Sequence, residues 1–184
     1  MMIKPLDLDG AFYLEPQLFH DNRGFFFEWF NQERFKALTN IEFKTVQFNY
    51  SRSTKGVLRG LHYQLNPMAQ SKLVAVVKGE IQDVIVDVRK NSRTYGQSYS
   101  VILNEEKKNQ LYIPKGFAHG FLVLSDEAEI FYAIDNPYSP EHDSGISYND
   151  SNLGISWELD FREIIVSDKD KNLLSLDSTP NNFE

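Results

Sequence analysis

Two of the four histidines in this chain stand in glycine-bracketed apolar segments that also carry cations. His62 lies within Arg59–Gln64, His119 lies within Ile113–Phe121, and Lys72 follows in the next apolar run. Imidazole gains and loses a proton near neutral pH, which few other side chains do. A histidine among fixed cations is therefore expected to act as a base on an anionic substrate.

Short β-rich runs separated by turn residues must position these side chains. Between Val46 and Ile134 the runs are too closely spaced to leave room for crossover helices, which indicates an antiparallel sandwich or barrel. The aromatic content of 14% also favours β structure. The expected strands are Leu73–Val77, Ile81–Val88, Tyr99–Leu103, Leu111–Ile113, Gly120–Leu124 and Glu129–Ile134.

One helix is expected near Asn31–Thr39. Asn31 can cap its start, and Phe35 and Leu38 are spaced i, i+3. The chain contains no internal repeat, linker or low-complexity tract, so residues 1–184 are expected to form a single domain. The polar tail, about 177–184, is expected to be frayed.

Charge and composition exclude several classes of function. The net charge of −7 argues against non-specific binding of nucleic acid and against an anionic membrane surface, although a few arginines can still form a local pocket for a small anion. The absence of cysteine excludes disulfides, thiolate ligands and a cysteine nucleophile. No apolar run is long enough for a signal peptide or a membrane span, so a cytoplasmic protein is expected.

Two segments resemble the metal-binding motifs of cupin barrels. Gly56 and His62 fit the start of the first motif, but Gln64 stands where the second histidine is expected, and no glutamate follows it. Pro114, Gly116 and His119 fit the second motif. Two histidines without a carboxylate or a third imidazole make a poor site for zinc or ferrous iron. The pattern therefore predicts a cupin-like barrel without a metal.

Further segments extend the resemblance to a particular family. Asp21–Glu28, Gln47–Ser51, Asp83–Arg89 and Ser167–Asp170, in that order and together with the two histidine segments, are similar to the dTDP-4-dehydrorhamnose 3,5-epimerase family. The resemblance runs from about Leu14 to Asp170. It implies an all-β, cupin-like jelly-roll barrel with a few short helices, working as a homodimer in dTDP-rhamnose and deoxysugar biosynthesis without a cofactor.

The chemistry of such an epimerase needs a base, an acid on the opposite face and a positive group beside the ketone oxygen. His62 is the candidate base and Lys72 the candidate cation that stabilises the enolate. The resemblance supplies Asp170 as the partner of the imidazole, and Tyr132 as the acid. The implied reaction inverts C3 and C5 of dTDP-4-dehydro-6-deoxy-D-glucose to give dTDP-4-dehydro-L-rhamnose.

The same resemblance implies a set of substrate contacts. Arg59 and Arg23 are fork-shaped donors suited to a diphosphate, and His119 is expected to donate to phosphate or sugar. Tyr138 matches the residue that stacks on thymine, and Arg23 and Glu28 are expected to reach into a partner subunit's site. The full predicted set is Arg23, Phe26, Glu28, Gln47, Asn49, Arg59, His119, Tyr138, Asp143 and Lys169.

Other residues favour structural roles. Within Ile81–Val88, the valines at 84, 86 and 88 share one face of the strand, and Asp83 and Asp87 share the other. These two aspartates are expected to pair with buried cations. His20 and His142 are expected at the surface, and the aromatic run 25–30 is expected in the core and at the dimer contact.

Three departures from the family pattern leave the substrate open. Phe48 and Tyr50 replace an acid and a histidine that are expected beside the ligand, Asp143 replaces a glutamate, and Glu158 follows Trp157 in place of a proline. Three alternatives are an epimerase acting at C3 or C5 alone, a non-catalytic sugar-nucleotide-binding cupin, and a metal-dependent cupin oxygenase, which Gln64 disfavours.

Overall fold

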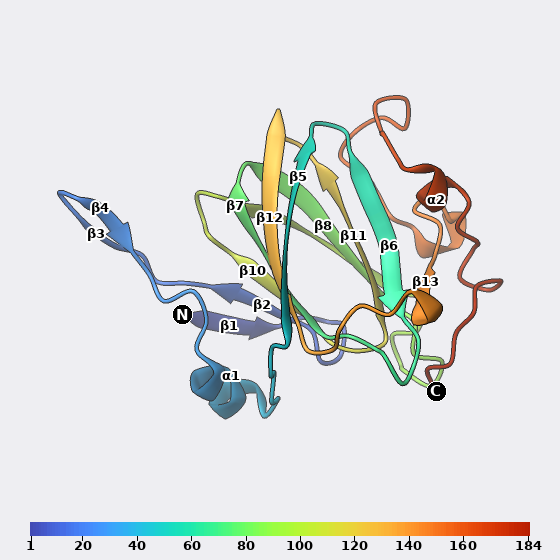
Figure 1. The fold of residues 1–184 in the computed structure, drawn as a ribbon, viewed down its shortest axis with the longest axis horizontal. Helices are drawn as coiled ribbons and strands as arrows, with labels where there is room; N and C mark the ends of the chain where they lie inside the picture. The colour runs from blue at the N-terminus through green and yellow to red at the C-terminus, as the bar shows by residue number, and fades with distance from the viewer.

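Two antiparallel β-sheets face each other across an apolar interior (Figure 1). The computed structural model describes residues 1–184. The six-stranded sheet has the order β1 (Met2–Pro5), β2 (Phe12–Glu15), β10 (Gln110–Ile113), β7 (Lys72–Lys78), β12 (Glu127–Ile134) and β5 (Gln47–Thr54). The five-stranded sheet has the order β13 (Asp143–Gly145), β6 (Leu58–Gln64), β11 (Phe117–Val123), β8 (Glu80–Asp87) and β9 (Ser98–Asn104).

The chain changes sheet at almost every connection after β5. Strands β5, β7, β10 and β12 belong to the six-stranded sheet, and β6, β8, β9, β11 and β13 belong to the five-stranded sheet, so only β8 and β9 are consecutive within one sheet. This double-sheet arrangement is the jelly roll that the strand spacing and the family resemblance predict. All six strands expected from the sequence are present, with ends that differ by up to three residues.

The helices are few and short. Helix α1 spans Gln32–Thr39, and the side chain of Asn31 accepts a hydrogen bond from the Arg34 N–H at 2.9 Å, as the predicted cap requires. Phe35 is fully buried, whereas Leu38 is 61% exposed and does not contribute to the core. The other helical segments are α2 (Asp168–Lys171), η1 (Pro140–His142) and η2 (Ser151–Leu153). None of these helices has the length and hydrophobicity that a membrane span requires.

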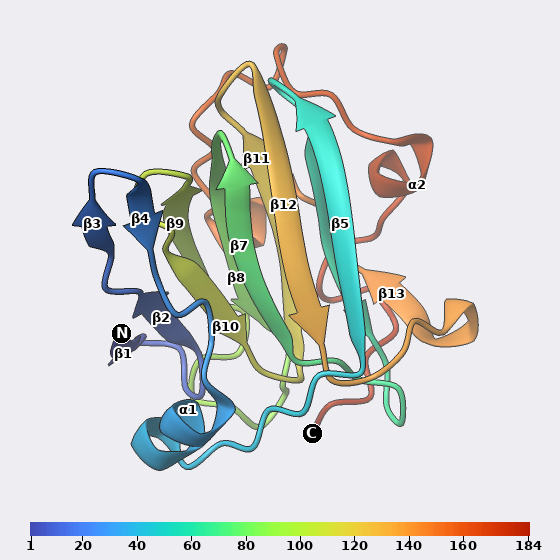
Figure 2. The same ribbon diagram turned by 60° about the vertical axis from the view of Figure 1, so that its left-hand side comes forward.

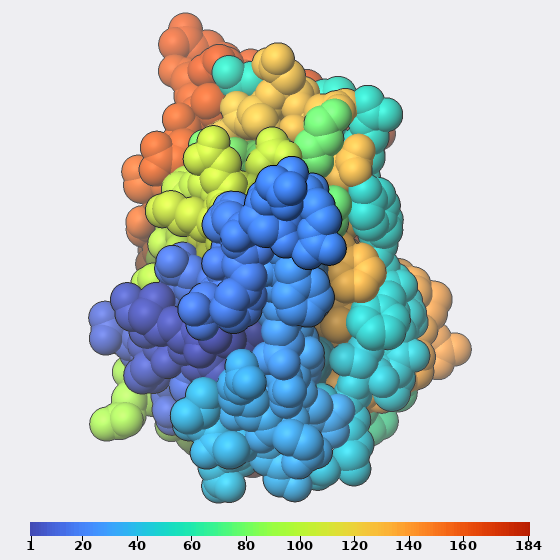
Figure 3. Space-filling model, turned by 90° about the vertical axis from the view of Figure 1, so that its left-hand side faces the viewer, coloured from blue at the N-terminus to red at the C-terminus, as the bar shows by residue number.

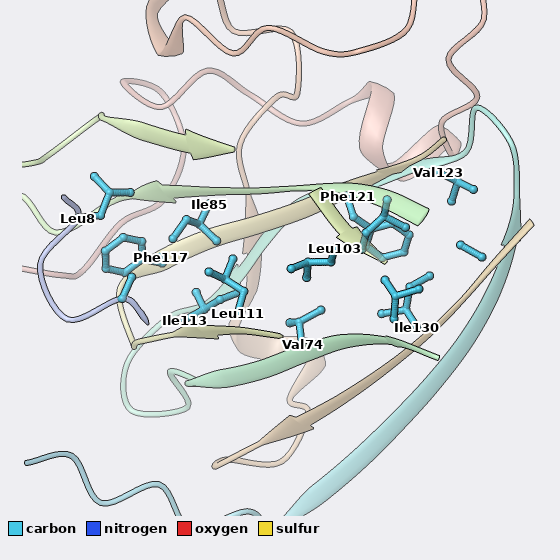
Figure 4. Close-up of a cluster of buried hydrophobic side chains, with 14 residues drawn as sticks. Leu8, Val74, Ile85, Leu103, Leu111, Ile113, Phe117, Phe121, Val123 and Ile130 are labelled. Atoms are coloured by element: carbon cyan, nitrogen blue, oxygen red, sulfur yellow. The ribbon is translucent and has the colours of Figure 1, made fainter. Parts of the chain in front are cut away.

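The core has one layer between the sheets, another outside the five-stranded sheet, and a smaller cluster around Phe35 of α1 and Tyr112 of β10. Figure 4 shows the inner layer, where Ile85 of β8 and Phe121 of β11 point from one sheet toward Val74 of β7 in the other. The outer layer packs Val84, Val86 and Val88 of β8 against Trp157, Leu176 and Phe183 of the C-terminal segment. Strand β8 is therefore buried on both faces, and its valines share one face as predicted.

The C-terminal tail is not frayed, contrary to the expectation from its polarity. Phe183 is buried in the outer core layer, and its carbonyl accepts a hydrogen bond from the Lys90 N–H at 3.2 Å. The Asn181 side chain donates to the Val88 carbonyl at 2.6 Å, and Tyr63 donates to the Pro180 carbonyl at 2.7 Å. One buried aromatic ring and these polar contacts fix a segment whose composition alone suggests disorder.

A two-stranded hairpin projects from the N-terminal part of the chain. Strands β3 (Phe19–Asp21) and β4 (Gly24–Phe26) pair only with each other and stand away from both sheets (Figures 1 and 2). Figure 3 shows this N-terminal segment raised on the face where β5 and β12 also reach the surface. Phe25 and Phe26 remain exposed on it at 53% and 71%.

Candidate active site

The principal cavity lies between the two sheets, beside strands β5 and β6. It has a volume of about 500 Å³ and is lined by Arg59, His62, Lys72, His119, Tyr132 and Asp170, among others. A second cavity of about 290 Å³ adjoins it, because His62, Lys72, Tyr132 and Lys169 line both. The four residues predicted for catalysis thus line one cavity.

His62 and Asp170 form a hydrogen-bonded pair in the wall of the larger cavity. The His62 Nε2 lies 2.7 Å from Asp170 Oδ1. An ionised carboxylate only accepts hydrogen bonds, so the proton of the neutral imidazole lies on Nε2 and Nδ1 is left as the base. The carboxylate would also stabilise the imidazolium that forms when Nδ1 takes a proton.

Asp170 is held in place by its own short helix and by β6. It lies in α2, where the Ser167 hydroxyl caps the helix and accepts a hydrogen bond from the Asp170 N–H at 3.1 Å. Asp170 Oδ2 accepts from the Gly60 N–H at 3.3 Å. Burial alone would raise the pKa of Asp170, but the hydrogen bond and charge of His62, with the bonds from Gly60 and Ser167, lower it below the ordinary value. Asp170 is therefore an anion at neutral pH.

Two glycines let β6 and β11 approach closely beside this pair. Gly60 has a φ of +130°, and a Cβ there would lie 2.5 Å from the Cα of Gly120. The pairing of β6 with β11 shifts register at the same place, between His119 and Phe121. His62 and His119 are direct partners across the two strands. The glycines that bracket both histidines in the sequence thus serve to bring the two imidazoles to one site.

His119 also has a carboxylate partner. Its Nε2 lies 2.9 and 3.1 Å from the two oxygens of Asp83, which is fully buried. Burial lowers the pKa of His119, opposed by Asp83 and assisted by the charges of Lys72 and His62. Asp87, the other aspartate on this face of β8, pairs with Arg89 at 2.7 Å. The Arg89 side chain is 24% exposed, so Asp87 pairs with a cation as expected, but that cation is only partly buried.

Lys72 lies between the two cavities with its side chain buried. Its Nζ donates to the His62 carbonyl at 3.3 Å. Burial lowers the pKa of Lys72 from 10.5 to about 8, against the opposing effect of the negative charges of Asp83 and Asp143. A buried cation with few partners of its own is available to a substrate oxygen that develops negative charge.

Tyr132 faces the cavities from β12. Its neighbour across the strand pair is Asn49 of β5, and its ring packs partly against the inner core layer. Burial raises the pKa of Tyr132, and the charge of Arg59 opposes that shift. The phenol is thus protonated at neutral pH and can donate a proton into the cavity.

Strand β5 turns a polar row toward the cavities. Gln47 and Asn49 line the smaller cavity, Ser51 lines the larger one, and Ser53 accepts a hydrogen bond from Arg59 Nε at 3.1 Å. Phe48 and Tyr50 alternate with this row and therefore lie on the outer face, 63% and 58% exposed. The expectation that these two residues lie beside the ligand is wrong for a single chain. Phe48 stacks instead on Phe131, with ring centroids 5.5 Å apart.

The smaller cavity gathers several of the residues predicted to bind the substrate. Tyr138 donates to Asp143 Oδ2 at 3.1 Å, and Lys169 forms an ion pair with the same carboxylate. Burial alone would lower the pKa of Lys169, but the hydrogen bond and charge of Asp143 raise it. The Tyr138 ring is 55% exposed at the rim, which leaves room for a planar group to stack on it.

Gln64 has a structural task at the position where cupins carry a metal-binding histidine. Its amide nitrogen donates to the carbonyls of Met68 at 2.6 Å and Pro137 at 3.2 Å, and its oxygen accepts from the Ser139 N–H at 2.7 Å. These bonds fix the loop that carries Tyr138. At the position of a histidine in the metal-binding motif, this chain thus has an amide that supports the loop at the rim of the smaller cavity.

Three residues predicted to bind substrate lie away from both cavities. Arg23 pairs with Asp21 on the exposed hairpin, and Phe26 points to solvent there. Glu28 forms an ion pair with Arg34 at 2.8 Å. The fold does not bring these three side chains to the site of their own chain. Their role stays a prediction that requires a second copy.

Sequence reasoning missed several residues that line the larger cavity. Ile165 and Val166 form part of its apolar wall, and Ser167 belongs to the same segment. The bridge between Val57 and Ile165 holds this segment against the start of β6. No local pattern marks these residues, although the Ser167-Asp168-Lys169-Asp170 run contains a helix-capping serine.

Of the remaining histidines, His20 is exposed as expected, whereas the His142 ring is partly buried and lies 2.8 Å from the Ser139 hydroxyl.

Comparison with known proteins agrees with this geometry. The sequence model of the family described as dTDP-4-dehydrorhamnose 3,5-epimerase matches residues 5–178. A dTDP-4-dehydrorhamnose 3,5-epimerase of Shigella flexneri is 49% identical over 172 residues, which cover 94% of each chain. The chain belongs to the dTDP-4-dehydrorhamnose 3,5-epimerase family.

Solved structures of the epimerase family superpose closely. The dTDP-6-deoxy-D-glucose-3,5-epimerase RmlC of Legionella pneumophila, in complex with dTDP-4-keto-L-rhamnose, matches with a TM-score of 0.93 and 43% identity, covering 100% of this chain and 99% of that chain. A 3'-monoepimerase of Streptomyces bikiniensis, in complex with dTDP-quinovose, matches with a TM-score of 0.89 and 36% identity, covering 95% and 87%. Enzymes that act at different numbers of carbons thus share this epimerase fold.

Proposed function

We propose that this chain inverts C3 and C5 of dTDP-4-dehydro-6-deoxy-D-glucose and gives dTDP-4-dehydro-L-rhamnose, for dTDP-rhamnose biosynthesis. The observation that carries the proposal is that the His62–Asp170 pair, Lys72 and Tyr132 line the same cavity. Both carbons flank the C4 ketone. One enolate-stabilising group and one acid–base pair can therefore serve both, if the hexose is repositioned between the two events.

In the proposed mechanism the unprotonated Nδ1 of His62 removes the proton next to the ketone. Asp170 stabilises the resulting imidazolium through Nε2. The Lys72 ammonium stabilises the enolate oxygen, and Tyr132 returns a proton to the opposite face of the ring. Positioned acids and bases each contribute about 10²–10⁴ in rate, so a cavity that holds both accounts for a large part of the catalysis.

We infer that the two cavities divide the substrate between them. Of the catalytic residues, Asp170 lines only the larger cavity, which favours that cavity for the hexose. Tyr138 lines only the smaller cavity, which favours that one for the thymine. Arg59 has a guanidinium with only one hydrogen bond in the chain, to Ser53, which leaves donors for the diphosphate. Gln47, Asn49, Asp143 and Lys169 are proposed to bind the nucleotide.

A homodimer is proposed from the hairpin. Arg23, Phe26 and Glu28 match family ligand positions, yet they lie outside the site of their own chain. An exposed phenylalanine on a projecting hairpin is an unfavourable feature for a monomer and a common one at an interface. In a closed two-fold dimer each hairpin would reach the partner's cavity, so both sites would be completed in the same way.

We infer that the reaction needs no metal, because Gln64 uses both ends of its amide to hold the Tyr138 loop. Activity is expected to survive exhaustive chelation. Loss of activity that a single divalent ion restores would contradict this and favour the metal-dependent alternative.

Isotope exchange tests the proposed reaction directly. The enzyme is incubated with dTDP-4-keto-6-deoxyglucose in deuterated water, and NMR measures deuterium at C3 and at C5 of the product. Deuterium at both carbons is expected. Deuterium at one carbon would favour a single-position epimerase, a function that the similarity to a 3'-monoepimerase makes the second candidate. Binding without exchange would indicate a sugar-nucleotide-binding protein that is not an enzyme.

A further inference from the structure

A second histidine–carboxylate pair lies beside the first. Asp83 is completely buried, and the His119 Nε2 is its hydrogen-bond partner at 2.9 and 3.1 Å. His119 lines the larger cavity, and its Nδ1 has no partner in the chain and is not enclosed by protein. His62 also has its Nε2 bound to a carboxylate, and the two histidines are neighbours across β6 and β11.

The position of the proton decides what His119 can do. A neutral imidazole carries one proton, and an ionised carboxylate can only accept it in a hydrogen bond. If Nε2 donates to Asp83, the free Nδ1 can only accept. The expectation that His119 donates to a phosphate would then be wrong, because phosphate oxygens are also acceptors. Burial, Lys72 and His62 all favour the neutral ring, since they lower the pKa of His119.

We propose that Asp83 is a positioning residue that fixes the proton of His119 on Nε2, so that Nδ1 accepts a hydrogen bond from a hydroxyl group of the substrate's hexose. The inference rests on the proposed function, which supplies the sugar nucleotide. The hexose is the partner for two reasons. His119 lines the larger cavity together with Asp170 and Arg59, and it does not line the smaller cavity around Tyr138. Of the substrate groups proposed for the larger cavity, the diphosphate offers only acceptors, whereas a hexose hydroxyl group can donate.

The burial of Asp83 suits this role. The negative charge of Asp83 also acts on Lys72, because it opposes the lowering of the Lys72 pKa by burial. A single buried carboxylate therefore influences two groups that line the larger cavity, the imidazole of His119 and the ammonium of Lys72. Without this carboxylate, the proton of His119 would no longer be confined to Nε2. The pKa of Lys72 would also fall further, because the negative charge of Asp83 would no longer oppose the effect of burial.

Binding of two probes to His119→Gln tests the polarity of the contact. A glutamine amide can keep the donor to Asp83 but offers no acceptor where Nδ1 lies. Calorimetry would compare dTDP with dTDP-glucose, which has the hexose hydroxyls but no ketone. We expect unchanged affinity for dTDP and about two- to tenfold weaker binding of dTDP-glucose, the size of one neutral hydrogen bond.

Two other outcomes of this comparison would overturn the inference. An equal loss of affinity for dTDP and dTDP-glucose would indicate that His119 binds the diphosphate. Unchanged affinity for both probes would indicate that His119 does not bind the hexose. Failure of the unmodified protein to bind either probe would contradict the proposed function instead, so the two failures are distinguishable.

Nitrogen NMR tests the tautomer without relying on a variant that folds. In the ¹⁵N-histidine-labelled unmodified protein, the His119 ring is assigned by its absence from the spectrum of His119→Gln. We expect a protonated Nε2 and an unprotonated Nδ1 at neutral pH. In Asp83→Asn, whose amide can either donate or accept, the proton is expected to be no longer confined to Nε2. A proton on Nδ1 in the unmodified protein, or an unchanged tautomer in Asp83→Asn, would overturn the proposed role of Asp83.

Discussion

His62 Nε2 and Asp170 Oδ1 lie 2.7 Å apart although the two residues are 108 positions apart in the chain. One belongs to the central part of β6, and the other belongs to a single-turn helix near the C-terminus that lies beside β6. The pair joins the barrel to the C-terminal segment and fixes which nitrogen of His62 faces the cavity. Its geometry is the starting point for the expected effects of substitution.

Asp170→Asn is expected to lower kcat by a factor of about 10²–10⁴ while the protein stays folded. The amide removes the charge that stabilises the imidazolium and no longer imposes the tautomer of His62. Steady-state kinetics with the keto-sugar measure the effect. Asp168→Asn is the matched control on the same helical turn, because the Asp168 side chain is 95% exposed. Equal activity of both variants would remove Asp170 from the mechanism.

His62→Ala and Tyr132→Phe are expected to separate the base from the acid. Without His62 no proton is removed, so both deuterium exchange and product should be lost. Without the phenol the imidazolium can still return a deuteron to the face it came from, so exchange can persist while inversion is lost. The measurement is the deuterium content of recovered substrate beside the product yield. Exchange that survives in His62→Ala and vanishes in Tyr132→Phe would reverse the two assignments.

The activity is expected to fall as pH rises through about 8, because Lys72 stabilises the enolate as an ammonium and burial lowers its pKa to that value. The pH profile of kcat/KM reports the ionisable groups of the free enzyme and should show this decrease above about pH 8, the alkaline limb of the profile. Lys72→Arg should lose the limb, since a guanidinium does not titrate there. A limb near pH 8 that persists in Lys72→Arg would assign it to another group.

Lys72 is expected to affect stability in the opposite direction to activity as pH rises. Between about pH 8 and the value near 10.4 of an unfolded lysine, the unfolded chain binds more protons than the folded chain. The contribution of Lys72 to the free energy of unfolding therefore rises with pH over that range. Denaturant titrations of the unmodified protein and Lys72→Met provide the check, because the methionine variant should lack this rise.

Arg59→Ala is expected to weaken dTDP binding by about ten- to a hundredfold, the range for a charge-assisted hydrogen bond of about 1.5–3 kcal/mol. Calorimetry measures the dissociation constants, and thermal unfolding checks that the fold is kept. Arg52→Ala is the matched control, because Arg52 points outward from β5 and pairs with Glu127. Unchanged dTDP affinity in Arg59→Ala would exclude Arg59 from the diphosphate site.

Mixing two inactive variants tests the shared site. Arg23→Ala and His62→Ala are each expected to be nearly inactive as purified dimers. If the hairpin completes the partner's site, a heterodimer of the two has one intact site, and random exchange of subunits should restore about a quarter of the normal activity. Activity that stays absent after exchange, with heterodimers demonstrated by native mass spectrometry, would show that Arg23 acts within its own chain or only on folding.

Local patterns in the sequence predict most of the secondary structure correctly. The period-two runs that predict strands, the Asn31 cap of α1 and the glycines around His62 and His119 are local features, and each has its expected place in the fold. The valine face of β8 is also correct. These features depend on backbone sterics and on the side-chain period of the strand, which neighbouring residues are enough to specify.

Which distant residues meet, and which faces of the strands become buried, depends on how the elements pack together. The alternation along β5 separates Gln47 and Asn49 from Phe48 and Tyr50 but does not say which pair faces inward. Apolar side chains usually face the interior, but here the polar pair faces the cavity. Phe183 orders a polar tail because an outer core layer exists for it to join. Asp170 becomes the partner of His62, and Asp83 that of His119, through the packing of α2 and the register of β8 against β11. Such pairings depend on contacts between segments far apart in the chain, and no local pattern of residue types encodes them.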